Sequence, residues 1–191
     1  PWTAFLYLIP IFVIIGLFRF YPIIFSIRAS FFKWGMGGPT SFSGLENYVN
    51  IFSDRYFWQA FSNTVWYAVF TVPLSLFLSL FAAVLLNNKL KGIGIFRTIY
   101  FLPVVTSIVA ISMIWKWIYH PEVGLANYIL NLLHFPTLKW LSEWRGIFEL
   151  MLGRDLPLLL QGPSLALFSI ILMTVWKGLG YNIVIFLAGL Q

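Results

Sequence analysis

The chain has 191 residues, of which 60% are hydrophobic and 9% are charged, and its mean hydropathy is +0.87. A soluble domain carries about 25% charged residues, so the composition excludes an ordinary globular domain. The net charge of +6 does not indicate nucleic-acid binding, because most Lys and Arg residues lie just beyond apolar stretches, as they do beside membrane-spanning helices.

The few charges divide the sequence into four long apolar windows, none of which contains Asp or Glu. The first window, Trp2–Ile27, is long enough to cross a bilayer, and we expect Pro10 and Pro22 to bend or end it. A polar connection follows over Arg28–Phe61, with a Gly/Pro-rich turn at Gly35–Pro39. Its later part has helical spacing and predicts a short helix at the membrane surface.

The other three windows have the same character. They run over Asn63–Leu86, Thr98–Tyr119 and Pro163–Leu190. The connection His120–Gly162 is apolar in its later part but interrupted by charges, so it predicts an interfacial or re-entrant helix rather than a span. The sequence therefore predicts an all-α, polytopic membrane helix bundle with about four transmembrane helices in the lipid bilayer.

The orientation of the bundle is predicted by the loop between the second and third windows. This loop carries Lys89, Lys91 and Arg97 without an acid, whereas the other connections mix both signs. Cytoplasmic loops carry the excess of basic residues, so we expect this loop inside and His120–Gly162 outside.

The sequence shows no motif for catalysis or for a bound cofactor. A phosphate-binding G-x-x-x-x-G-K-[ST] string, an H-E-x-x-H string and a Gly-x-Ser-x-Gly elbow are all missing. The two histidines, His120 and His134, lie in one connection, where we interpret them as ordinary interfacial residues rather than metal ligands. We therefore predict a protein that is not an enzyme, without catalytic residues, metal or cofactor. Its windows also lack the buried acids of proton-coupled transporters.

The fourth window holds the candidate functional residues. Lys177 is a charge near its middle, and an ammonium in a membrane marks a functional site by default. Trp176, Tyr181 and Asn182 lie beside it and predict, with Lys177, a segment that lines a solute path. The alternative stays open: Gly178 and Gly180 favour a kink and close helix packing, in which Lys177 snorkels or meets backbone carbonyls.

Four strings carry a resemblance to a known family. The chain resembles the permease subunits of binding-protein-dependent ABC importers, in the sugar group that includes maltose and glycerol-phosphate permeases. The strings are YPIIFSIRASF (21–31), FSGLENYVNIFSDRYFWQAFSNTVWY (42–67), GIGIFRTIYFLPVVTSIVAISMIWKWIYHPEVGLANYIL (92–130) and VWKGLGYNIVIFLAGLQ (175–191).

The resemblance implies a type I ABC importer permease, multi-pass in the plasma (inner) membrane. It implies a second permease subunit, cytoplasmic ATPase subunits and an external solute-binding protein as partners. Residues 1–60 would hold the first transmembrane helix and an outer connection, and residues 61–191 the permease core. We expect the chain to be part of a longer protein, with the family's ATPase-coupling loop after Gln191. The segment 143–162 looks longer than in the family.

The resemblance indicates an importer permease for a carbohydrate or related polyol. A stand-alone secondary transporter or channel for a small polar solute is the alternative, and sequence beyond Gln191 would separate the two. Nothing in the sequence identifies the sugar or shows whether the permease pairs with itself or with a different subunit.

Overall fold

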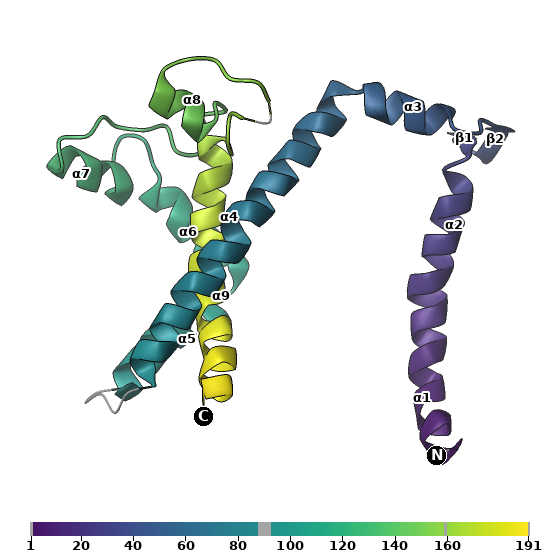
Figure 1. Ribbon diagram of the computed structural model, residues 1–191, viewed down its shortest axis with the longest axis horizontal. Helices are drawn as coiled ribbons and strands as arrows, with labels where there is room; N and C mark the ends of the chain where they lie inside the picture. The colour runs from purple at the N-terminus through teal and green to yellow at the C-terminus, as the bar shows by residue number, and fades with distance from the viewer. Residues whose placement is uncertain (1, 88–92, 159, 191) are drawn as a thin grey trace. The chain divides into compact units, whose positions relative to one another are not determined.

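The computed structural model describes residues 2–87, 93–158 and 160–190. It divides into two compact units, 1–58 and 59–191. In the first unit, α1 (Trp2–Ile15), the π-helix η1 (Gly16–Phe20) and α2 (Tyr21–Ala29) form one long helix (Figure 1). Pro10 lies inside α1 and does not end it. The π-turn ends just before Pro22, whose ring would clash with the carbonyl four residues earlier in a regular helix.

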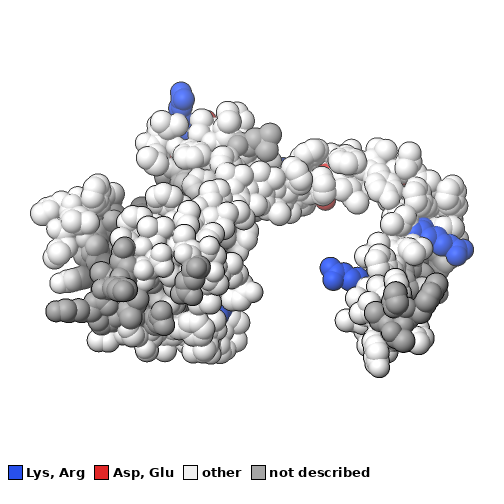
Figure 2. Space-filling view, turned by 60° about the horizontal axis from the view of Figure 1, so that its bottom comes forward, with Lys and Arg blue, Asp and Glu red and all other residues white. Residues whose placement is uncertain are grey.

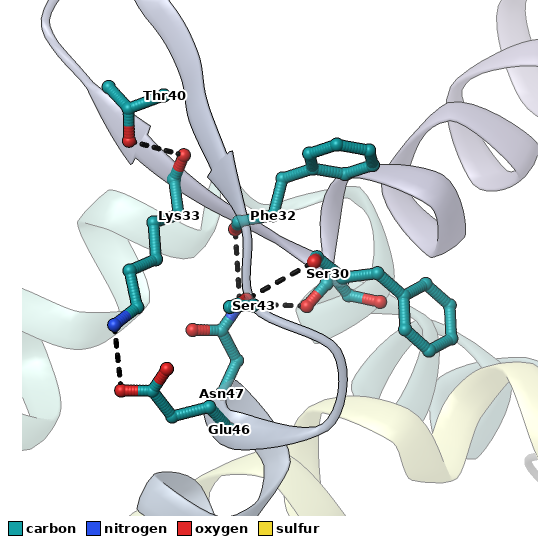
Figure 3. A network of polar contacts seen from close by, with 8 residues as sticks. Ser30, Phe32, Lys33, Thr40, Ser43, Glu46 and Asn47 are labelled. Atoms are coloured by element: carbon teal, nitrogen blue, oxygen red, sulfur yellow. Dashed lines mark hydrogen bonds and ion pairs between the residues drawn. The ribbon is translucent and has the colours of Figure 1, made fainter.

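A short hairpin, which the sequence predicted only as a turn, follows the first span and adds two strands to the predicted all-α bundle. Strands β1 (Phe32–Gly35) and β2 (Gly38–Phe42) pair antiparallel around the predicted Gly/Pro-rich turn. Asn47, in α3 (Glu46–Ser53), donates from Nδ2 to the carbonyls of Ser30 at 2.7 Å and Phe32 at 3.1 Å (Figure 3). The network thus ties the hairpin to α3, the helix predicted at the membrane surface.

The predicted surface helix is shorter than expected, because its later residues belong to the second span. The helix α4 runs without interruption over Arg55–Leu86. Asp54 is extended, and its carboxylate accepts a hydrogen bond from the Tyr56 amide at 2.8 Å. This contact caps the start of α4, so the second span begins eight residues before the window that starts at Asn63.

The second unit contains most of α4 and all of the later helices. These are α5 (Ile93–Val105), α6 (Ile108–Ile118), α7 (Leu125–Leu132), α8 (Ile147–Leu152) and α9 (Leu165–Leu190). Helices α5 and α9 lie side by side (Figure 1). In the connection between α6 and α9, the apolar stretch forms only the single short helix α8, because Gly153 ends it in a left-handed conformation.

Three described helices are long and apolar enough to cross a membrane: 5–29, Arg55–Leu86 and Leu165–Leu190. The third predicted window is different, because its helices α5 and α6 meet at a bend of 110°. The pair is either a broken span or a re-entrant loop. The expectation of about four apolar spans agrees with this arrangement once the bent pair is counted as one. Uncharged side chains cover most of the face in Figure 2.

Candidate functional site

The contact between α5 and α9 depends on a glycine. Gly180 is buried, and a Cβ built at this position would lie 2.7 Å from Val104 Cγ2 and closer still to the Tyr100 carbonyl. No side chain fits there without moving the backbone of α5. A small residue therefore lets the two helices approach closely, as at other helix contacts in lipid.

The bend between α5 and α6 lies beside this contact. Helix α5 ends at Val105, and α6 begins at Ile108 behind the N-cap residue Ser107. Ser107 is extended, and its Oγ accepts a hydrogen bond from the Val109 amide at 3.3 Å. Serine is a favoured N-cap residue, so the local sequence favours the start of a second helix at this point.

Lys177 reaches from the middle of α9 to the bend. Its Nζ donates to the carbonyl oxygens of Pro103 at 3.2 Å and of Thr106 at 3.4 Å. Of the two interpretations left open for Lys177, the structure therefore shows contact with backbone carbonyls. The carbonyls belong to the bent pair rather than to a kink in α9, which is continuous over Leu165–Leu190.

Asn182 reaches in another direction, to α4. Its Nδ2 donates to Ser75 Oγ at 2.9 Å. Ser75 is part of a row of small residues spaced by four along α4, which continues to Ser79 and Ala83, both fully buried. The hydroxyls of Thr71 and Ser79 have no hydrogen-bond partner in the part of the chain that the structure describes. Sequence reasoning missed this row, although its four-residue spacing is visible in TVPLSLFLSLFAA.

The two aromatic candidates are the more exposed pair. Trp176 is 41% exposed and makes an edge contact with Trp115, with ring centroids 5.7 Å apart. Tyr181 is 64% exposed. Trp176 also borders a cavity of about 520 Å³, large enough for a small organic molecule. The cavity is mostly apolar and is further lined by Ala82, Leu85, Leu86, Ile99, Tyr100, Pro103, Leu179 and Ile183.

The four predicted path residues therefore do not converge on one point. Lys177 binds the α5–α6 bend, Asn182 binds α4, and the two aromatic rings keep exposed surface. In the described ranges, no three His, Cys, Asp or Glu residues lie close enough to hold a metal ion. His120 serves a turn, because its Nδ1 accepts from the Glu122 amide at 3.3 Å.

Proteins similar to this chain were found by sequence and by structure, although no family model matches it. A probable ABC transporter permease protein of Pyrococcus horikoshii is 33% identical over 97% of this chain and 58% of its own length. The lactose transport system permease protein LacF of Rhizobium radiobacter is 35% identical over 99% of this chain and 57% of its own length. The chain thus spans more than half, but not two thirds, of these relatives.

A solved structure supports the fold. A chain in a crystal structure of a bacterial alginate ABC transporter, in complex with an alginate pentasaccharide-bound periplasmic protein, matches 98% of this chain with a TM-score of 0.69. The match covers 56% of that chain at 18% identity, so it speaks for the fold alone. The relatives confirm the predicted resemblance: this chain is homologous over nearly its whole length to membrane permeases of ABC transporters, sugar permeases among them.

Proposed function

We propose that this chain is the membrane-spanning part of a permease subunit in an ATP-driven importer of a carbohydrate or related polyol. The observation that carries the proposal is the identity of 30–35% to several sugar transport permeases over most of the chain. These include a lactose, a xylose/arabinose and a trehalose/maltose permease. The shared chemistry of these solutes is a ring with many hydroxyl groups.

The charge distribution supports an external source of energy. No Asp or Glu lies in residues 55–86, 98–118 or 165–190, so these spans offer no acid for a proton relay. We assign ATP hydrolysis to separate cytoplasmic ATPase subunits, and we assign solute delivery to an external solute-binding protein. A second permease subunit would complete the bundle in the plasma (inner) membrane, with residues 1–60 as a peripheral span and 61–191 as the core.

Within this bundle, we assign the solute path to the exposed rings of Trp176 and Tyr181 on α9. Both rings keep exposed area, and aromatic rings can pack on the apolar face of a sugar. Lys177 and Asn182 would border the path, with their polar groups engaged on α5 and α4. The apolar cavity beside Trp176 adds room next to the ring.

The test is uptake of a panel of radiolabelled sugars and polyols by the complete transporter in proteoliposomes. We expect Tyr181→Ala to lower uptake about tenfold, equivalent to about 1.4 kcal/mol, while subunit assembly is unchanged. Tyr128→Ala is the matched control, because Tyr128 is similarly exposed at 63% but lies on α7. Unchanged uptake in Tyr181→Ala would contradict the assigned path. Uptake without the ATPase subunits and ATP would instead favour a secondary transporter or channel.

A further inference from the structure

The bend between α5 and α6 exposes carbonyl groups that need a donor. Helix α5 ends at Val105, so the Pro103 carbonyl lies in its last turn, where carbonyls lack intrahelical partners. In α6, the Ile111 amide donates to the carbonyl of Ser107 at 3.1 Å, which leaves the Thr106 carbonyl outside the helix. Hydrocarbon supplies no donor, so a broken helix in a membrane must obtain one from a neighbouring segment.

Lys177 supplies this donor for both carbonyls. An ammonium has three N–H donors and no acceptor, so it can bond Pro103 O at 3.2 Å and Thr106 O at 3.4 Å at the same time. No acid competes for the ammonium, because the windows over 98–119 and 163–190 contain no Asp or Glu. The negative ends of the two carbonyl dipoles therefore take the place of a carboxylate partner for the ammonium.

The close approach at Gly180 brings the ammonium to the bend. Gly180 packs against Tyr100 and Val104 of α5, and Lys177, one helical turn earlier on α9, bonds Pro103 and Thr106. The earlier residue of α9, Lys177, thus contacts later residues of the α5–α6 segment than Gly180 does. The two helices therefore run antiparallel, and these contacts define their register. Gly180 and Lys177 therefore lie on the face of α9 that packs against α5 and the bend.

We propose that Lys177 is a positioning residue that ties α9 to the α5–α6 bend and sets the angle of that bend, rather than a ligand of the solute. This role rests on the proposed function in one respect, because the solute path that the bend would border is the one proposed above. It explains the single charge in the fourth window without a charged substrate. It also predicts that the bend needs the donors of Lys177 whether or not solute is bound.

The test measures the bend directly in the assembled transporter. Spin labels on cysteines at Ile95 in α5 and Ile114 in α6 report the distance across the bend by pulsed electron resonance, and both positions are exposed. The sequence contains no cysteine of its own, so only other segments and subunits need cysteine replacement. We expect one narrow distance distribution in the parent protein and a shifted or broadened one in Lys177→Met.

Two further variants separate positioning from general loss of charge. Lys177→Arg keeps the donors and should restore the parent distance. Lys116→Met removes an exposed lysine of α6 that has no hydrogen bond or ion pair to another described residue, and it should leave the distance unchanged. Failure of Lys177→Met alone to assemble would also support positioning, because a solute ligand is not needed for assembly.

Two results would overturn the proposal. One is a parent-like distance in Lys177→Met, above all with reduced uptake, because that combination marks a solute ligand. The other is a Lys177→Arg variant whose distance matches that of Lys177→Met. Since the measurement needs no solute, it can fail while the Tyr181 result stands, and the reverse also holds.

Discussion

At the scale of single residues, two charged side chains of the second unit bond the main chain. Lys177 donates to two carbonyls, and Glu149, which is 9% exposed, accepts from the amides of Gly146 at 3.1 Å and Leu156 at 3.0 Å. A buried charge is tolerated when groups of opposite polarity surround it. Each of these side chains therefore fixes a stretch of irregular backbone that no helix or strand would hold.

Gly180 gives the sharpest prediction at this scale. Gly180→Ala should destabilise the assembled permease by about 1–3 kcal/mol, because the new methyl group meets the backbone of α5. Gly189→Ala is the matched control in the same helix: a Cβ there meets nothing within 4 Å, so the change should be neutral or stabilising. Thermal unfolding in detergent compares the two variants, and equal midpoints would contradict the close helix contact.

At the scale of elements, the described residues of the connection before α9, 143–158 and 160–162, form a loop that packs on the start of that helix. The Ile147 amide donates to the Pro163 carbonyl at 2.9 Å, and the Leu165 amide donates to the Arg145 carbonyl at 3.1 Å. Phe148 makes an edge contact with Trp66 of α4, with centroids 5.8 Å apart. The loop thus contacts both α4 and the start of α9, and the buried carboxylate of Glu149 bonds the amides of Gly146 and Leu156 on either side of α8.

Glu149→Gln should loosen this loop. The two carboxylate oxygens each accept one backbone amide, whereas glutamine offers a single oxygen and faces the other amide with its own NH₂ group. An unsatisfied buried group costs about 1–3 kcal/mol, so we expect faster cleavage of the loop in limited proteolysis. Glu122→Gln is the control, because the Glu122 carboxylate has no partner among the described residues. Equal cleavage rates would show that the carboxylate is dispensable.

The sequence predicted the long apolar elements better than the breaks between them. Long apolar windows without Asp or Glu marked the three continuous spans, because length and hydropathy decide whether a helix can cross a bilayer. The bend at Thr106 and Ser107 was missed, since both residues sit inside the third window and a hydropathy average does not register a cap. The hairpin was predicted only as a turn, because strands of four and five residues leave little periodic signal.

The candidate site was predicted as a segment but not as a set of contacts. Lys177 stood out because its charge is visible in the sequence, whereas its partners are backbone carbonyls, which every residue carries. The partner of Asn182, Ser75, lies 107 residues away on α4, and no local pattern links the two. Helix packing decides which distant residues come into contact, and such contacts between helices cannot be predicted from the local pattern of a single sequence.

At the scale of the whole molecule, the orientation in the membrane stays a prediction. It rests on Lys89 and Lys91, which lie outside the described residues, and on Arg97, whose side chain does too. All six acids belong to the two connections that would face outward, but this placement does not decide the orientation. Basic residues stay preferentially on the cytoplasmic side, whereas acids contribute little to the choice. The predicted orientation therefore depends on the basic loop between the second and third windows alone.

Cysteine labelling in intact cells tests this orientation with one position on each side. Ser142 is exposed in the connection predicted outside, and Asn87 is exposed at the edge of the basic loop predicted inside. We expect Ser142→Cys to react with a membrane-impermeant maleimide added to intact cells, and Asn87→Cys to react only after lysis. The chain has no native cysteine to compete for the reagent. The reverse pattern would invert every span, and would place the loop built around Glu149 on the cytoplasmic side instead of the side where solute is delivered.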